Sequence, residues 1–167
     1  NQINHQKNYL LKNLRLKINV MGLSNSKKMI LSEEPISLLE WENLLYEGEK
    51  ADRDIYFDYI KSKNLRNSIF IDNTASPIIS KEYHKFLKNS IGVVTCNKIA
   101  CADELKNYKI LKNVSRKFSS PFLFETNVGA GLPIIDTLNN LIASGDRIIK
   151  IQAILSGSLN YIFNNFD

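Results

Sequence analysis

Alternation of apolar and polar residues predicts a β-strand near the start of the chain. Residues 6–13 have the pattern of the end of a helix, and residues 14–20 then alternate, with apolar side chains at the even positions. A polar stretch from Gly22 to Lys28 follows and predicts a loop. The predicted order in this part of the chain is therefore helix, strand, loop.

Two helices are predicted after this loop. Ser37 and Glu40 have the spacing of a capping box, which predicts a helix to about Glu47. A second helical pattern covers roughly Asp52 to Lys63. Apolar side chains recur at helical spacing in both segments and should face a core. They are Leu38, Trp41 and Leu45 in the first helix, and Ile55, Tyr56, Tyr59 and Ile60 in the second.

Short apolar runs alternate with helical patterns in the rest of the chain. The predicted strands cover residues 68–72, 92–95, 122–126 and 147–155. The predicted helices run from Ser80 to about Lys88, from about Ala102 to Phe118 and from Pro133 to Ala143, with Gly145 ending the third. Ser156, Gly157 and Ser158 turn into a last helical run that stops at Asp167. The residues expected to be buried in the helices that begin at Ser80 and at about Ala102 are Tyr83, Phe86, Leu87, Leu105, Tyr108 and Leu111.

This order of strands and helices predicts an α/β fold with a parallel sheet and helices on both faces. In such sheets, ligands bind at the carboxyl ends of the strands. Four loops are expected there, over residues 22–28, 73–77, 96–100 and 126–132. These loops are where candidate chemistry should be sought.

Composition restricts the classes of function. The 167 residues are 44% hydrophobic and 23% charged, as in an ordinary globular domain, and no apolar run is long enough to cross a membrane. Cys96 and Cys101 fit no zinc or disulfide pattern, so we expect a reducing cytoplasm. The net charge of +5 comes from lysines spread along the chain, without a nucleic-acid reader motif. We therefore expect neither nucleic acid nor a membrane as a partner, whereas a phosphate-bearing cofactor is compatible with this charge.

The first loop suits the 2′-phosphate of NADP. In a dinucleotide-binding fold, an acidic residue after the strand that precedes this loop would bind the ribose 2′-hydroxyl of NAD. No acidic residue occurs between Val20 and Leu31. Ser24, Ser26 and Lys27 offer hydrogen-bond donors and positive charge instead. A solvated basic loop explains the same residues, so NADP is favoured over NAD without excluding it.

Two further loops carry donors that could meet a cofactor or substrate. Thr74 and Ser76 follow the strand that ends at Asp72, but polar strand ends are common. Lys98 follows Asn97 at the end of the next strand and can donate to a substrate oxygen or to a nicotinamide group. An ordinary exposed lysine is the competing interpretation.

The stretch from Glu125 to Pro133 exposes its backbone. Two glycines and an alanine in a row, Gly129 to Gly131, allow a sharp turn or direct ligand contact with carbonyl groups. Glu125 adds a carboxylate, and oxygen-rich surroundings suit a hard cation. The alternative is a plain strand-to-helix turn, with Pro133 at the first helical position.

Three motifs together resemble homoserine dehydrogenase, and most closely the type fused behind aspartokinase. They are TCNKIA at 95–100, ETNVGAGLPI at 125–134 and ILSGSLNYIF at 154–163, and the resemblance covers about residue 10 to the end. It implies NAD(P)-dependent interconversion of L-homoserine and L-aspartate 4-semialdehyde in threonine and methionine biosynthesis. It also implies a partial Rossmann-like domain over residues 1–126 and the start of an α+β substrate-binding and dimerisation domain over 127–167, in a homo-oligomer.

The resemblance also implies roles for individual residues. Thr74 and Ser76 would line the cofactor cleft with Thr95 near them, and Lys98 would lie between nicotinamide and substrate. Gly157 and Ser158 would begin the substrate pocket. A monovalent cation, sodium by resemblance, would be held by Glu125 and the carbonyl groups of Val128, Ala130 and Leu132.

Some positions depart from the family pattern. Cys96 stands where proline or alanine is common, and Ile99 where a second lysine often occurs. No sequence of the form G-x-G-x-x-G is present, so we expect the family's first strand and phosphate loop to be missing. We accordingly expect a portion without activity of its own. A non-catalytic Rossmann-like remnant or oligomerisation module is the alternative.

Overall fold

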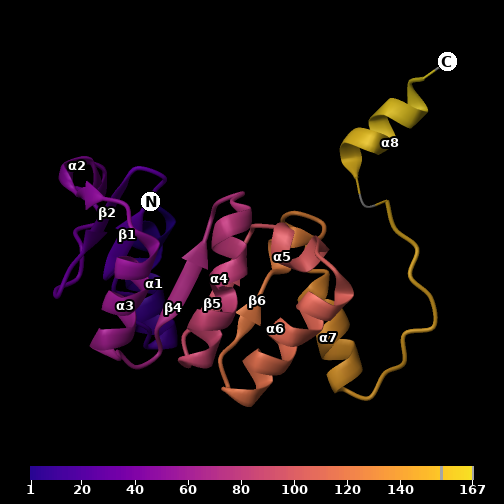
Figure 1. Ribbon diagram of the computed structural model, residues 1–167. Coiled ribbons are helices and arrows are strands. Elements are labelled where there is room, and N and C mark those ends of the chain that lie inside the picture. The colour runs from indigo at the N-terminus through magenta and orange to yellow at the C-terminus, as the bar shows by residue number, and fades with distance from the viewer. Residues whose placement is uncertain (155, 167) are drawn as a thin grey trace. The chain divides into compact units, whose positions relative to one another are not determined.

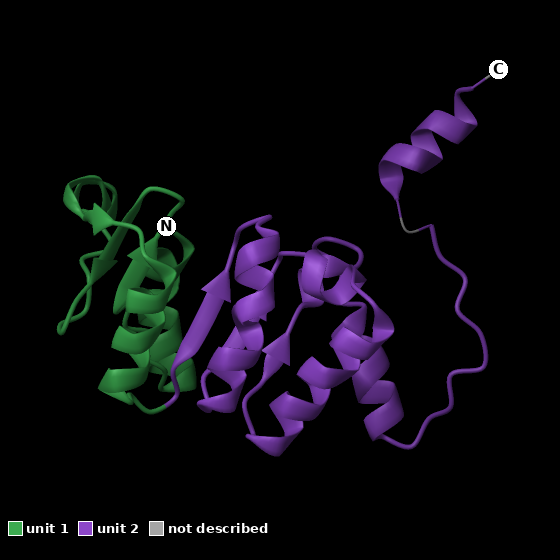
Figure 2. Cartoon of the chain, in the orientation of Figure 1, with its two compact units in different colours: residues 1–66 green, residues 67–167 purple. Residues whose placement is uncertain are grey.

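The computed structural model describes residues 1–154 and 156–166 and is drawn in Figure 1. The chain divides into two compact units, residues 1–66 and 67–167, coloured separately in Figure 2. Among the described residues, no helix has both the length and the apolar character needed to cross a membrane.

The first unit contains three helices and a small antiparallel sheet. Its sheet has the order β1-β2-β3, with Leu23 of β1 opposite Ile30 of β2. The elements are α1 (Gln2–Leu14), β1 (Gly22–Ser24), β2 (Lys28–Leu31), α2 (Trp41–Glu47), β3 (Glu49–Lys50) and α3 (Arg53–Lys63). Met29 and Leu45 are buried in its core.

Two predictions for the start of the chain are wrong. Residues 15–21 form no strand, and the side chains of Leu16 and Ile18 are about half exposed. An alternating pattern produces a strand only where a neighbouring strand supplies hydrogen bonds. Here the Leu16 amide instead donates to the Leu10 carbonyl in α1. The predicted loop at 22–28 is a β-hairpin, because Asn25 Oδ1 accepts from the amides of Lys27 and Lys28 at 2.8 Å each and closes the turn.

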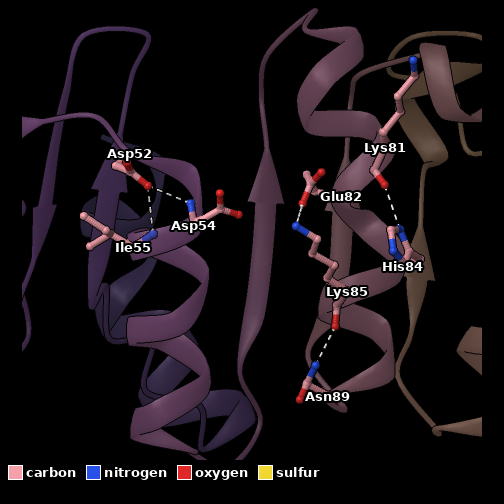
Figure 3. A network of polar contacts seen from close by, with 8 residues as sticks. All are labelled: Asp52, Asp54, Ile55, Lys81, Glu82, His84, Lys85 and Asn89. Atoms are coloured by element: carbon pink, nitrogen blue, oxygen red, sulfur yellow. Dashed lines mark hydrogen bonds and ion pairs between the residues drawn. The ribbon is translucent and has the colours of Figure 1, made fainter.

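The capping-box prediction is also wrong. Helix α2 begins at Trp41, and Ser37 instead accepts a backbone hydrogen bond from Glu40 in a preceding turn. Helix α3 is confirmed, and Asp52 Oδ1 caps it by accepting from the amides of Asp54 and Ile55 (Figure 3). Ile55 is 54% exposed rather than buried, because it lies in the first turn beside that cap. Tyr56, Tyr59 and Ile60 are half-buried, as are Leu38 and Trp41.

The second unit contains the parallel sheet, which confirms the predicted α/β class. The strand order is β4-β5-β6, and Ile69 pairs with Gly92 while Val93 pairs with Phe122. The strands are β4 (Ile69–Asp72), β5 (Gly92–Thr95) and β6 (Phe122–Leu123). The helices are α4 (Pro77–Lys88), α5 (Ile99–Ala102), α6 (Leu105–Lys117), the 3₁₀-helix η1 (Glu125–Asn127), α7 (Ile135–Ala143) and α8 (Gly157–Asn164).

Aromatic contacts join the sheet to α4. Phe70 stacks on Phe86 with ring centroids 4.0 Å apart, and Tyr83 lies 5.9 Å from Phe122. Tyr83, Phe86 and Leu87 are buried as predicted. On the solvent side of α4, Glu82 pairs with Lys85, His84 Nδ1 lies 2.8 Å from the Lys81 carbonyl, and Asn89 donates to the Lys85 carbonyl at 2.9 Å (Figure 3).

Several predicted boundaries in this unit need correction. Ser76, not Ser80, caps α4, while Ser80 lies buried within the helix and donates to the Pro77 carbonyl. The helix predicted from about Ala102 to Phe118 is α6, which starts at Leu105, and the short helix α5 before it was not predicted. Leu105 is 64% exposed rather than buried. In the same helix, Tyr108 is half-buried and Leu111 is buried as predicted. The third strand ends at Leu123, because the chain turns into η1.

The end of the chain is partly as predicted. Helix α7 is confirmed but starts at Ile135, after Pro133, and Gly145 follows it with φ of 92°. The strand predicted over 147–155 is absent from residues 147–154, where Ile149 is 94% exposed and no paired strand supports it. Helix α8 is confirmed, with Ser156 as its N-cap. Leu155 and Asp167, where a predicted strand and a predicted helical run end, lie outside the described residues.

Candidate functional site

Three of the four predicted ligand loops follow the strands of the parallel sheet. Residues 73–77 follow β4, residues 96–100 follow β5, and the stretch from Glu125 to Leu132 follows β6. Because parallel strands end at a common edge, the topology brings these loops together. The fourth loop belongs to the first unit, where Ser24, Ser26 and Lys27 lie exposed around the turn between β1 and β2.

A buried carboxylate lies beneath these loops. Asp72 ends β4 and is 1% exposed. Its Oδ1 accepts from the Thr74 amide at 2.7 Å, and its Oδ2 accepts from the Tyr83 hydroxyl at 2.5 Å and from Asn97 Nδ2 at 3.1 Å. A buried charge is stable only with such compensation. Asp72 therefore connects the loop after β4 to α4 and to the loop after β5.

Tyr83 and Thr95 complete the buried network. Burial, and then the hydrogen bond to Asp72, raises the pKa of Tyr83 far above its ordinary value of 10.0. The phenol therefore stays neutral and donates to Asp72 at neutral pH. Thr95 Oγ1 lies 2.7 Å from the Tyr83 hydroxyl and accepts from the Asn97 amide at 2.9 Å.

Asn97 links all three loops. Its Nδ2 donates to Asp72 and, at 3.0 Å, to the Ser76 carbonyl, while its Oδ1 accepts from the Ile99 amide at 3.2 Å. Its backbone carbonyl accepts from Asn127 Nδ2 at 3.3 Å. Asn127 belongs to η1 after β6, so one buried asparagine bonds to residues that follow each strand.

Lys98 lies exposed immediately after this buried asparagine. It is the N-cap residue of α5, and its carbonyl accepts from the amides of Cys101 and Ala102. Its backbone is thus fixed on both sides, while its ammonium group faces solvent. Thr74 is exposed in the neighbouring loop, and Ser76 is half-buried, with its hydroxyl turned to the Ile79 amide.

The carboxylate of Glu125 accepts hydrogen bonds from the first turn of α7. Its Oε1 accepts from the Ile135 amide at 2.9 Å and its Oε2 from the Asp136 amide at 2.8 Å. These two amides are among the donors that a helix leaves unpaired at its first turn. The carboxylate therefore folds the intervening glycine stretch back onto the helix that follows it.

The glycine stretch itself turns sharply. Gly129 and Ala130 have φ of 74° and 53°, and the Leu132 amide donates to the Gly129 carbonyl at 3.0 Å. The Leu132 carbonyl accepts from Ile134 and keeps a second lone pair, as do the oxygens of Glu125. The Leu132 carbonyl and the Glu125 carboxylate therefore retain unused acceptor capacity. Among the described residues, no group of three or more His, Cys, Asp or Glu side chains could hold a metal ion.

A hollow of about 330 Å³ adjoins this stretch. Its lining consists of Cys101, Asp103, Leu105, Tyr108, Phe124 and Val128. Burial raises the pKa of the Cys101 thiol, so this group is protonated at neutral pH and is a poor nucleophile. Asn127 Oδ1 is buried and has no hydrogen-bond partner within the described part of the chain.

Sequence reasoning placed some residues at this edge and missed others. Thr74, Ser76, Thr95 and Lys98 lie at the carboxyl ends of β4 and β5, as expected. Gly157 and Ser158 instead begin α8, where both are exposed. The residues that sequence reasoning missed are Asp72, Tyr83, Asn97 and Asn127. A signal existed for Asp72 and Asn97, because each is a polar residue directly at or after the end of an apolar strand.

A parallel sheet with helical crossovers and polar loops at its carboxyl edge defines a dinucleotide-binding type of α/β protein. The family model for the NAD-binding domain of homoserine dehydrogenase matches residues 1–125, and that for homoserine dehydrogenase itself matches residues 133–167. The chain belongs to the homoserine dehydrogenase family.

Known relatives are longer than this chain. It is 40% identical to bifunctional aspartokinase/homoserine dehydrogenase 1 of Arabidopsis thaliana over 167 residues, which are 99% of this chain and 18% of that protein. It is 41% identical to homoserine dehydrogenase of Schizosaccharomyces pombe over 149 residues, 87% of this chain and 39% of that one. The chain thus spans less than half the length of either relative.

Two solved structures are similar in fold. A Candida auris protein described as of unknown function has a TM-score of 0.80 and 32% identity, over 93% of this chain and 45% of its own. A hyperthermophilic archaeal homoserine dehydrogenase in complex with NADPH has a TM-score of 0.61 and 23% identity, over 82% of this chain and 44% of its own.

Proposed function

We propose that this chain forms the cofactor-binding part of an enzyme that interconverts L-homoserine and L-aspartate 4-semialdehyde. The observation that carries the proposal is the position of Lys98 in a chain of this family. The lysine follows the central strand of the parallel sheet, is exposed, and is anchored by the buried Asn97 beside it. The loop edge where it lies is the usual ligand position in such sheets.

The residues at this edge divide the work of the reaction. When bound, a nicotinamide cofactor supplies or accepts the hydride. The ammonium group of Lys98 donates a hydrogen bond to the substrate oxygen and stabilises the negative charge that develops there. Thr74 and Ser76 would contact the cofactor, whereas Thr95 is 3% exposed and would act only through its neighbours. In the whole enzyme, Gly157 and Ser158 at the start of α8 would begin the substrate pocket.

Substitution of Lys98 tests this assignment. Homoserine-dependent reduction of NADP would be followed by absorbance on the 167-residue chain and on a version extended at both ends. We expect activity in the extended form, and a loss of about 10²-fold or more in kcat for Lys98→Ala, the usual range for a lost proton-handling group. Lys88→Ala, which removes an exposed lysine at the end of α4, should leave kcat unchanged.

Two outcomes would count against the proposal. A folded extended protein without activity would contradict the homoserine assignment and favour a non-catalytic dinucleotide-fold module. An active protein whose Lys98→Ala variant keeps its turnover would remove only Lys98 from the mechanism.

We propose NADP rather than NAD as the preferred cofactor. The turn between β1 and β2 presents Ser24, Ser26 and Lys27 to solvent, and no carboxylate lies between Val20 and Leu31 to accept from a ribose hydroxyl. We expect Lys27→Ala to raise KM for NADP about tenfold while KM for NAD changes little, since one charge-assisted contact contributes about 1.5–3 kcal/mol. Lys61→Ala on α3 is the control, and equal effects on both cofactors would contradict the preference.

A monovalent cation, sodium in our proposal, would be held by Glu125 and the carbonyl groups of Val128, Ala130 and Leu132. The support is the acceptor capacity that these oxygens retain in a sharp turn. The carboxylate would then serve both the cation and the first turn of α7. Thermal unfolding in buffers with and without sodium tests this, because a bound cation would raise the unfolding temperature.

We further propose a division at the glycine stretch, with residues 1–126 in the cofactor domain and 127–167 beginning a substrate-binding and dimerisation domain. The whole enzyme would be a homo-oligomer that serves threonine and methionine biosynthesis. The family match supports this reading, since its two models meet near the same stretch. Analytical ultracentrifugation of the extended protein tests the oligomeric state. A monomer would contradict the proposed homo-oligomer.

A further inference from the structure

The strongest unassigned feature is the buried polar network under the three loops. Asp72, Tyr83, Thr95 and Asn97 are each at most 3% exposed, although all four carry polar groups. Burial of this many polar groups is unfavourable unless each is satisfied, and a network of this kind then fixes one geometry. None of the four is exposed enough to meet a ligand directly, so their contribution must act through other residues.

We propose that Asn97 is a positioning residue that presents Lys98 to the substrate, with Tyr83 and Asp72 fixing the orientation of its amide. This inference rests on the function proposed above.

The geometry of Asn97 leaves its side chain a single orientation. Nδ2 needs acceptors, which Asp72 Oδ2 and the Ser76 carbonyl provide at 3.1 and 3.0 Å. Oδ1 needs a donor, which the Ile99 amide provides at 3.2 Å. A rotated amide would set Nδ2 against the Ile99 amide and Oδ1 against two acceptors. Since Lys98 lies between Asn97 and Ile99, its backbone is held from both sides by one side chain.

Asp72 and Tyr83 stabilise that orientation through buried hydrogen bonds. The Tyr83 hydroxyl donates to Asp72 Oδ2, the same oxygen that accepts from Asn97, and also contacts Thr95 Oγ1. Thr95 in turn accepts from the Asn97 backbone amide. Removing the Tyr83 hydroxyl would leave the aromatic packing with Phe122 in place but would loosen both groups that hold Asn97.

Asn127 extends the same control to the glycine stretch. Its Nδ2 donates to the Asn97 carbonyl, so movement of Asn97 would also release the start of the segment that leads to Val128. Asn97 therefore sets the mutual register of the loops after β4, β5 and β6, where cofactor and substrate would have to meet.

Three variants in the extended protein test the proposal. Asn97→Ala removes the whole amide, Tyr83→Phe removes only a hydroxyl, and Ser120→Ala is the matched control. Ser120 is 1% exposed and donates to the Leu87 carbonyl at 2.8 Å. It precedes the amino end of β6, so its loss removes one buried hydrogen bond at the opposite end of the strand from the loops. Tyr83→Phe is the variant expected to fold without difficulty, should Asn97→Ala not do so.

The readout is the separation of kcat from KM. We expect kcat to fall by about tenfold or more in Asn97→Ala and by roughly three- to tenfold in Tyr83→Phe, with KM for both substrates within about threefold, because misplacing a reacting group by 1 Å is enough for such losses. Ser120→Ala should lower the thermal midpoint to a similar extent as Tyr83→Phe without lowering kcat. A kcat in both site variants no lower than in Ser120→Ala would overturn the proposal.

Hydrogen exchange separates this inference from the proposed function. In peptides covering residues 96–102, exchange should be faster in Asn97→Ala and Tyr83→Phe than in wild type, and unchanged in Ser120→Ala. If the wild type is folded but inactive, the proposed function fails, whereas the exchange result still decides whether Asn97 holds the loop. Unchanged exchange in both variants would overturn the positioning role even in an active enzyme.

Discussion

Two glycines in the loop after η1 differ in what a methyl group would meet. A Cβ on Gly129 would lie 2.3 Å from Ile134 Cδ1, and the residue has φ of 74°. A Cβ on Gly131 would meet nothing within 4 Å. The first position therefore favours glycine chiefly through its backbone conformation, because the nearest atom is the movable end of the Ile134 side chain. The second position has neither constraint.

We predict that Gly129→Ala lowers the free energy of unfolding by about 1 kcal/mol or more, because alanine is strained at a positive φ and the Ile134 side chain would also have to move. Gly131→Ala should change it by less than about 0.5 kcal/mol, as is usual for surface positions. Urea denaturation followed by circular dichroism measures both variants. Equal midpoints for the two would show that the turn tolerates a side chain at Gly129.

Single residues also show what sequence reasoning could and could not find at the site. The position of Lys98 at the carboxyl edge of the sheet was predictable, because it lies shortly after an apolar strand in a recognisable motif. The sequence identifies Asn97 only as the neighbour of Lys98, since its importance depends on Asp72, 25 residues away, and on Asn127, 30 residues away. No local pattern encodes contacts across that separation, and the burial that makes them significant appears only in the folded chain.

At the level of elements, caps set by neighbouring residues were partly predictable. Gly145 ends α7 as expected, and α3 runs over nearly its predicted range, with Asp52 at its start. The cap of α7 was not predictable in this way. Its acceptor is Glu125, which precedes the helix by ten residues and reaches it only because the glycine stretch turns back.

We predict that Glu125→Ala destabilises the second unit by about 1 kcal/mol, the usual effect of losing a helix cap. The control is Glu104→Ala, because Glu104 precedes α6 without a side-chain cap hydrogen bond. Thermal and urea unfolding give the comparison. A Glu125→Ala variant as stable as Glu104→Ala would contradict the capping role.

A second substitution at the same position, Glu125→Gln, separates capping from cation binding. If Glu125 holds sodium, wild type should unfold at a higher temperature in sodium than in tetramethylammonium buffer, and Glu125→Gln should lose that difference. A wild type indifferent to sodium would contradict the cation proposal and leave the cap intact.

Strands were predictable where a partner exists. Residues 69–72 and 92–95 read as short apolar runs, and both form strands of the parallel sheet. Residues 14–20 and 147–154 have equally suggestive patterns, but no strand forms over them. The pattern reports a compatible side-chain arrangement, whereas the hydrogen-bonding partner has to be supplied by another part of the fold.

At the scale of the molecule, alkaline pH should weaken the first unit through Tyr56. Burial raises the pKa of Tyr56 from 10.0 to about 12. Its ring packs against Gly22, where an added Cβ would lie 3.1 Å from the hydroxyl. A raised pKa means that the unfolded chain ionises first as pH increases. The stability linked to Tyr56 is therefore intact below pH 10 and is lost as pH rises towards 12.

We predict that this loss amounts to roughly 2–3 kcal/mol between pH 10 and 12, from a shift of about two pKa units. Urea unfolding at a series of pH values, followed by near-ultraviolet circular dichroism, measures it. Tyr56→Phe should flatten the dependence, whereas Tyr46→Phe should not, since Tyr46 is 83% exposed. A pH profile identical in wild type and Tyr56→Phe would contradict the assignment.

The register of the parallel sheet bears on the order in which the second unit folds. Pairing of the strands requires Ile69 to meet Gly92 across a connection that contains α4, and Val93 to meet Phe122 across one that contains α6. Helix α4 carries its own cap at Ser76 and needs only local contacts to start, whereas each strand pairing has to close a long loop. Helix formation should therefore precede strand pairing, and the apolar strands at 69–72 and 92–95 would remain open to association with other chains during that interval.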